Sequence, residues 1–247
     1  MSELNNQLIL ISGASATGKS ASLRNIRNQN KWYYAGCEAG KALPFKNNFN
    51  TLKIQDPYQI YEVFDRAMDN PEECQGDCQG IIIDSLTFLM DMFESQYVIN
   101  SANTMKGWSN FQQFFKILMQ DKVLKFGKPT LILAHTQDFL DEKTLETKTY
   151  VPIKGALKAN GVESFFTTVI STKKVAIKDL EPYKNDMLNI TEDEEILGFK
   201  YCFQTMLTKQ TIGERIRSPM GMFSRNQTYI DNDAQVLLDY INNYYNN

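Results

Sequence analysis

Apolar positions along the chain follow two alternating patterns. Short apolar runs are followed by longer segments in which apolar residues recur every three or four positions. The runs are typical of strands buried on both faces and the longer segments of amphipathic helices, so their alternation predicts an α/β fold with a mainly parallel sheet flanked by helices. The expected strands cover 8–11, 32–36, 80–84, 130–135, 165–171, 174–178 and 199–207, and the expected helices lie after the first strand and at 58–68, 86–99, 107–125 and 233–245.

The segment 137–160 interrupts this alternation. Its first part, 137–150, carries Asp138, Asp141, Glu142, Lys143, Glu146 and Lys148. Because so many charges cannot be buried, we expect a protruding loop or hairpin. The chain has 247 residues, of which 43% are hydrophobic, and this is enough to form one α/β domain over 1–247.

The overall charge excludes one class of function. A net charge of −3 and a pI near 5.4 argue against a protein that coats nucleic acid with its whole surface, although a local basic patch remains compatible. Lys154, Lys158, Lys173, Lys174 and Lys178 could form such a patch or an ordinary solvated face. No charged-then-apolar leader precedes the first strand and no apolar run reaches about 18 residues, so we expect a cytoplasmic protein without a membrane segment.

The segment 13–20 carries the most specific chemical signal. It matches the phosphate-binding pattern Gly-x-x-x-x-Gly-Lys-Ser directly after the 8–11 run, and helix-forming residues follow it. In such a P-loop, backbone N–H groups and the start of the next helix surround a phosphate. Lys19 is expected to reach the β and γ phosphates of ATP, and the Ser20 hydroxyl to bind Mg²⁺.

Two carboxylates follow strands that are expected to end beside this loop. Asp84 ends the 80–84 strand, where a carboxylate reaches the Mg²⁺ shell, and Glu38 follows the 32–36 strand, where a general base meets the γ phosphate. His135 ends the 130–135 strand. Ligands of open α/β sheets bind outside the carboxyl ends of the strands, so these groups should share one crevice. Capping of the following helix is the alternative role for Asp84.

Together, the P-loop, Glu38, the Ile-Ile-Ile-Asp-Ser segment at 81–85 and the Leu-Ile-Leu-Ala-His-Thr-Gln segment at 131–137 resemble the ATPase core of RecA-like proteins. The resemblance implies that Glu38 polarises the attacking water and that Asp84, with Ser85, ends the Walker B strand. It also implies a γ-phosphate sensor among His135, Thr136 and Gln137, without deciding between them. The implied nucleotide-contacting residues are Gly13, Ala14, Ser15, Ala16, Thr17, Gly18, Lys19, Ser20, Ala21, His135 and Gln137.

The C-terminal part narrows this resemblance. Residues 209–223 and 229–233 resemble the end of compact phage RecA-like ATPases of the Sak type, the single-strand annealing group. That resemblance implies binding of single-stranded DNA, annealing or strand exchange in recombination or replication, and a phage single-strand-binding protein as partner. Arg215 and Arg217 also resemble the Lys-x-Arg element with which ring-forming relatives reach a neighbour's γ phosphate, which implies a homo-oligomer; two surface arginines are the alternative.

Two other functions are compatible with a P-loop. A kinase of a small molecule or nucleotide would transfer the phosphate to a bound acceptor, but such kinases usually carry a lid with several arginines, and residues 100–130 contain none. The second alternative function is an ATP-dependent assembly factor in which hydrolysis is vestigial. The presence of Glu38 argues mildly against this alternative. The leading prediction is therefore a Mg²⁺-dependent ATPase that acts on single-stranded DNA.

Overall fold

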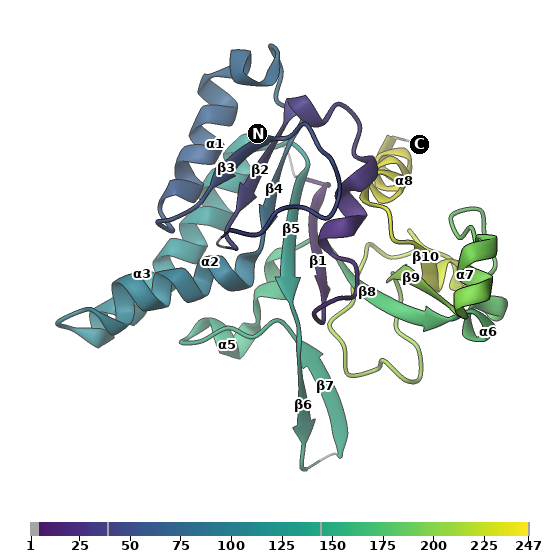
Figure 1. Cartoon of the computed structure of the whole chain (residues 1–247). Coiled ribbons are helices and arrows are strands. Elements are labelled where there is room, and N and C mark those ends of the chain that lie inside the picture. Colours follow the sequence, from purple (N-terminus) through teal and green to yellow (C-terminus); the bar gives the residue numbers. More distant parts are fainter. Residues whose placement is uncertain (1–4, 39, 144, 247) are drawn as a thin grey trace.

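An eight-stranded sheet forms the centre of the computed structural model, which describes residues 5–38, 40–143 and 145–246 (Figure 1). The strand order is β10-β9-β8-β1-β5-β4-β2-β3. Neighbours from β8 to β3 are parallel, whereas β9 is antiparallel to both β8 and β10. The strands are β1 (Leu8–Gly13), β2 (Trp32–Gly36), β3 (Asn50–Lys53), β4 (Gly80–Asp84), β5 (Thr130–His135), β8 (Thr168–Ala176), β9 (Phe199–Gln204) and β10 (Tyr229–Asp231). The predicted α/β class with a mainly parallel sheet is confirmed.

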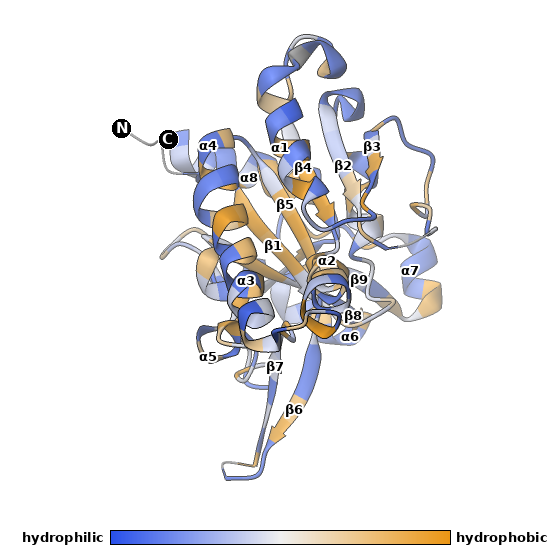
Figure 2. Cartoon of the chain, turned by 90° about the vertical axis from the view of Figure 1, so that its left-hand side faces the viewer, coloured by the Kyte–Doolittle hydropathy of each residue, from blue (hydrophilic) through white to orange (hydrophobic). Residues whose placement is uncertain are grey.

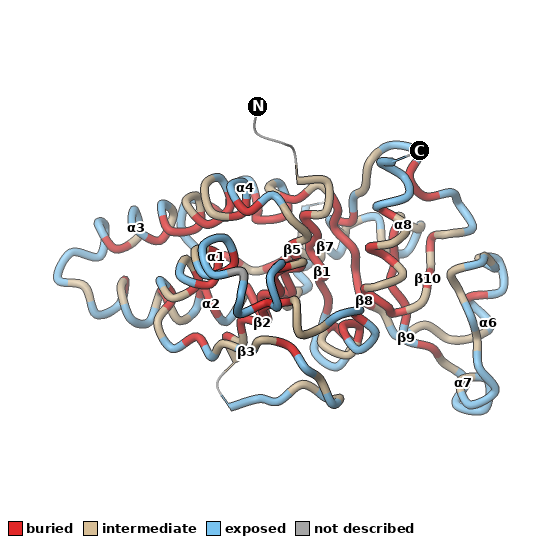
Figure 3. Tube along the Cα trace, turned by 90° about the horizontal axis from the view of Figure 1, so that it is seen from above, coloured by how far each residue is buried: buried red, intermediate tan, exposed pale blue. Residues whose placement is uncertain are grey.

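Helices cover both faces of the sheet because the central strands are apolar on both faces. In β1, Leu8 and Leu10 contact one core cluster and Ile9 and Ile11 contact the other. The central strands are accordingly hydrophobic (Figure 2) and buried (Figure 3). The helices are α1 (Gln59–Asp69), α2 (Leu86–Phe93), α3 (Thr104–Ile117), α4 (Val123–Phe126), α5 (Leu157–Asn160), α6 (Ile177–Leu180), α7 (Glu192–Leu197) and α8 (Ala234–Asn246). Side chains of α1 to α4 form the first cluster, and α8 contributes to the second.

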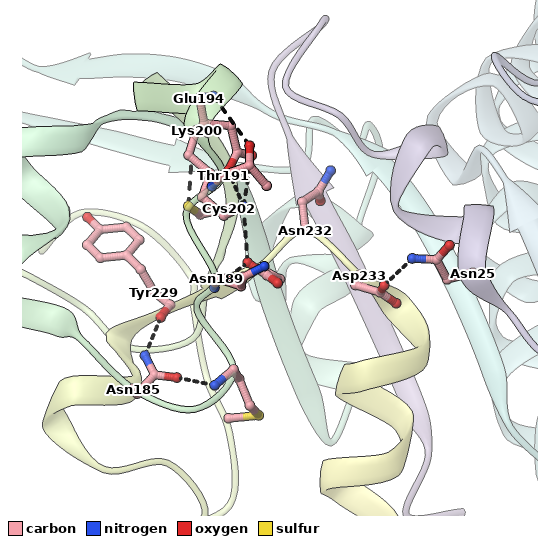
Figure 4. A network of polar contacts seen from close by, with 12 residues as sticks. Asn25, Asn185, Asn189, Thr191, Glu194, Lys200, Cys202, Tyr229, Asn232 and Asp233 are labelled. Carbon is pink, nitrogen blue, oxygen red and sulfur yellow. Dashed lines mark hydrogen bonds and ion pairs between the residues drawn. The ribbon is translucent and has the colours of Figure 1, made fainter. Parts of the chain in front are cut away.

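The helix predicted after the P-loop is much shorter than a usual α-helix. It is a 3₁₀ helix, Ser20–Asn25. Polar side chains tie this segment to the start of α8: Asn25 Nδ2 donates to Asp233 (2.5 Å, Figure 4), and Arg24 donates to the carbonyl of Asn232 (2.8 Å). A short helix has a weaker dipole than a long one, so binding of an anion here depends on the loop backbone and on Lys19.

Two strands that the sequence predicts separately form one continuous strand in the structure. The expected strands 165–171 and 174–178 form the single strand β8, and Ile177–Leu180 is helical. Only Thr168–Ser171 pair with β1, and the rest of β8 continues past the carboxyl end of β1, paired with β9. The predicted strand 199–207 ends at Gln204. The carboxyl edge of the sheet therefore extends beyond the P-loop on this side.

The predicted protrusion is confirmed as a hairpin, but it is shorter than 137–160. Strands β6 (Gln137–Asp141) and β7 (Glu146–Tyr150) form a two-stranded antiparallel sheet that projects from the molecule (Figure 1). Beyond it, Val151, Ile153 and Leu157 are buried in the core cluster of α1 to α4, which places 151–160 on the body of the domain. No helix among the described residues is long and apolar enough to span a membrane.

Candidate nucleotide-binding site

The P-loop follows β1 and turns sharply at its apex. Ala16 and Gly18 adopt left-handed backbone conformations, with φ of 60° and 94°. A Cβ atom on Gly13 would lie 2.1 Å from Thr172 Oγ1, and one on Gly18 would lie 2.5 Å from Asn232 Nδ2. Both glycines are therefore required by close packing as well as by the turn. Ala14, Ser15 and Ala16 form the exposed apex, and Ala21 is half-buried.

Lys19 is a buried cation beneath this loop. Its Nζ donates to the carbonyl oxygens of Gly13 (2.9 Å) and Ala14 (2.7 Å). Burial lowers the pKa of Lys19 to about 8, although the carboxylates of Asp84 and Glu38 oppose the shift. Because two neutral carbonyls cannot compensate a buried charge fully, an anion held in the loop would be stabilised by this side chain.

Asp84 lies next to the first residue of the 3₁₀ helix. Its Oδ2 accepts hydrogen bonds from Ser20 Oγ (2.8 Å) and from the Tyr34 hydroxyl (2.9 Å). Burial raises the pKa of Asp84, and these two hydrogen bonds limit the shift. The predicted Ser20–Asp84 pair is thus brought together, and Asp84 contacts the P-loop even though it also precedes α2.

Glu38 also lies at the carboxyl edge of the sheet, between His135 and Lys41. Its Oε1 lies 3.2 Å from His135 Nε2, and its Oε2 accepts from Lys41 Nζ (2.6 Å). Partial burial would raise the pKa of Glu38, but the hydrogen bonds from Lys41 and His135 outweigh this effect and lower it. Glu38 is therefore a carboxylate at neutral pH, which is the form that can accept a proton.

The three sensor candidates occupy different places. His135 contacts Glu38, and its backbone N–H donates to Thr87 Oγ1 (2.9 Å). The backbone N–H of Thr136 donates to the carbonyl of Gly13 (3.1 Å). Gln137 lies at the base of the hairpin and lines a separate cavity of about 230 Å³. The geometry therefore favours His135 over the other two.

Neither predicted arginine contacts the P-loop of its own chain within the described residues. Arg215 pairs with the buried Glu163 (2.9 Å), and its guanidinium carbon lies 5.3 Å from the centre of the Tyr150 ring. The backbone of Arg217 pairs with Val169 at the edge of β8, and its side chain is exposed. The segment that carries both arginines is therefore attached to the sheet at Val169.

Sequence patterns did not indicate four polar residues that contact the candidate site residues. Tyr34 and Lys41 bind Asp84 and Glu38, as described above. Thr172 Oγ1 lies 2.5 Å from Thr17 Oγ1, and Asn232 Nδ2 donates to the carbonyl of Gly18 (2.9 Å). The last two lie 155 and 214 residues away from their partners along the chain. No local motif marks such contacts.

No protein-family model matches this chain, and no curated protein sequence matches it.

Proposed function

We propose that this chain binds and hydrolyses ATP with Mg²⁺ and acts on single-stranded DNA, as a RecA-like ATPase of the Sak type. The observation that carries the proposal is the contact of Asp84 with Ser20 beside the buried Lys19. These three groups are the ones that a P-loop enzyme needs for the metal ion and the phosphates.

In this proposal each side chain has one role. Lys19 neutralises charge on the β and γ phosphates, Glu38 orients the attacking water, and His135 connects Glu38 to β5. A carboxylate with a lowered pKa is a weak base, so Glu38 acts mainly by orienting water.

The donor set fits Mg²⁺ that arrives with a nucleotide. Among the described residues, no group of three or more His, Cys, Asp and Glu could hold a metal ion alone. Mg²⁺ needs only one or two protein oxygens when phosphates and water complete its octahedron, and Ser20 and Asp84 supply them. Ser85 Oγ and Asn232 Oδ1, next to Asp84 and Gly18, are buried without a hydrogen-bond partner in the described chain, which leaves polar atoms for a ligand or its water.

The DNA part of the proposal rests on the C-terminal resemblance and on lysines near the carboxyl edge. The β6–β7 hairpin gives little support for DNA binding, because the four carboxylates of the hairpin outnumber the two lysines. In the same proposal the active form is a homo-oligomer that works with a phage single-strand-binding protein.

Phosphate release from ATP tests the proposal. We expect turnover with Mg²⁺, loss of turnover with EDTA, and loss in Asp84→Asn, while Lys106→Ala, an exposed lysine on α3, behaves as wild type. Stimulation by a dT oligonucleotide is expected. Absence of any turnover with Mg²⁺ and DNA, or transfer of the phosphate to a small acceptor instead of water, would contradict the proposal.

A further inference from the structure

A second cleft lies beyond the P-loop, where β8 continues past β1. It has a volume of about 520 Å³ and lies between β8, the α6 segment and the chain that follows β9. Its size is in the range of small-molecule and nucleotide sites. Its lining includes Lys173, Lys174, Lys178, Tyr183, Gln204 and Tyr229.

Gln204 lines this cleft and has an unused hydrogen-bond acceptor. The side chain is fully buried, and its Nε2 donates to the Met206 carbonyl (2.8 Å) and to Thr211 Oγ1 (2.7 Å). Since a carbonyl oxygen can only accept, these contacts determine which end of the amide is nitrogen. Oε1 has no partner among the described residues. A buried acceptor of this kind can accept from a donor outside the chain, such as a ligand N–H or a water.

The charge of the cleft favours an anion. Three lysines and one acid, Asp179, line it, and Lys173 is neutralised by Glu214 (2.5 Å). Lys174 lies over the Phe199 ring, 3.7 Å from its centre, and Lys178 is exposed without an ion-pair partner in the described part of the chain. Two cations therefore remain available for phosphate groups.

The two tyrosine rings of the cleft already pack against each other in the free protein. The rings of Tyr183 and Tyr229 meet edge to face with centroids 5.0 Å apart, and both are half-buried. Asn185 Nδ2 donates to the Tyr229 carbonyl (2.9 Å), which fixes that strand (Figure 4). A partly exposed ring beside Lys174 and Lys178 can stack on a base.

We infer that this cleft binds a nucleotide unit of single-stranded DNA, with Lys174 and Lys178 on the phosphates, a tyrosine ring on the base, and Gln204 Oε1 accepting from a base N–H. Every nucleobase carries an N–H donor, so the site accepts any sequence. The inference rests on the proposed function for its choice of polymer. The inferred DNA site is a different place from the acidic β6–β7 hairpin and from the cavity lined by Lys154 and Lys158.

Fluorescence anisotropy with a labelled mixed-sequence oligonucleotide tests the cleft. Lys178→Glu and Tyr183→Ala are each expected to weaken binding by about tenfold or more, because a phosphate contact or a stacked base is lost. Lys178→Ala should lower the slope of log K against log salt by about 0.7. Lys106→Glu and Lys158→Glu are the matched controls and should stay within about twofold of wild type. Calorimetry should give unchanged ATP affinity for all variants.

Photo-crosslinking gives an independent readout that does not depend on variants. An oligonucleotide with 5-iododeoxyuridine is expected to crosslink to Tyr183 or Tyr229. Crosslinks confined to other regions, or loss of binding in Lys158→Glu but not in Lys178→Glu, would overturn the inference. Turnover of ATP without any DNA binding would overturn it while leaving the ATPase intact; binding in the cleft without turnover would contradict the proposed ATPase alone.

Discussion

Lys19 carries a positive charge at a place where burial disfavours it. Its pKa is about 8 in the free protein, and a bound triphosphate would raise it. Below pH 8 the side chain is already charged, so ATP affinity should not change with pH through the titration of Lys19. Above pH 8 binding must take up a proton, so affinity should fall by up to about tenfold per pH unit.

Calorimetry at about pH 7 and about pH 9.5, in buffers of different ionisation enthalpy, measures this effect. We expect weaker binding and uptake of about one proton at the higher pH. Equal affinity at both values, without proton uptake, would show that Lys19 does not contact the phosphates.

Glu38 is the residue on which hydrolysis depends in this account. Glu38→Gln should keep ATP affinity, because the amide preserves shape, and should lose turnover by a factor of about 10² to 10⁴, because an amide lacks the negative charge with which the carboxylate orients the attacking water and attracts its proton. Glu62→Gln on the exposed side of α1 is the control. Wild-type turnover in Glu38→Gln would assign the water-orienting role to another residue.

The candidate site was partly predictable at the scale of single residues. Lys19, Ser20 and Asp84 follow from a local motif and from a strand end, and the structure brings them together. The contact of His135 with Glu38 joins the ends of two strands that are not neighbours in the sheet, so no local pattern selects it from 135–137.

At the scale of elements, hydrophobic runs were the reliable signal. The bounds of β2, β4 and β5 agree with the apolar runs because these strands are buried on both faces. β3 and α7 were missed, because β3 lies at the sheet edge with alternating exposed residues and α7 buries no side chain. β10 was missed because it has only three residues. β8 was divided in two because the polar residues Thr172 and Lys173 interrupt its apolar pattern.

β8 also provides a direct physical connection between the P-loop and the second cleft. Thr172 contacts Thr17 of the loop, and the next residue, Lys173, lines the cleft. Thr172→Val removes the hydroxyl contact at nearly constant volume. We expect ATP affinity and DNA affinity measured separately to stay near wild type, whereas the effect of ATP on DNA affinity should disappear. Thr168→Val, buried on the same strand but away from the loop, is the control. An unchanged effect of ATP in Thr172→Val would exclude this connection.

At the scale of the whole molecule, Arg217 is better suited than Arg215 to act on a neighbouring subunit. Arg215 is held by Glu163 within its own chain, whereas no hydrogen bond or ion pair holds the Arg217 side chain in the described residues. We expect Arg217→Ala to lose turnover by about 10³ or more, the usual effect of an arginine finger. Arg215→Ala should mainly lower the free energy of unfolding, because it leaves the buried Glu163 without its cation.

Mixing inactive variants tests action across a subunit boundary. A mixture of Arg217→Ala and Glu38→Gln should recover part of the turnover, because at one class of interface an intact Arg217 meets an intact Glu38. Wild-type turnover should also rise faster than linearly with protein concentration. An inactive mixture together with linear scaling would indicate a monomeric ATPase.

In an ATPase that acts on single-stranded DNA, we propose that nucleotide in the P-loop controls binding of the DNA. The most direct measurement is the DNA affinity of the wild type with Mg²⁺, with and without a non-hydrolysable ATP analogue, next to Lys19→Ala. Coupling between two sites typically changes affinity by about 5- to 150-fold, so we predict a change in this range for the wild type and none for Lys19→Ala. Equal DNA affinity of the wild type in the presence and absence of the analogue, at a concentration that saturates the P-loop, would contradict the claim.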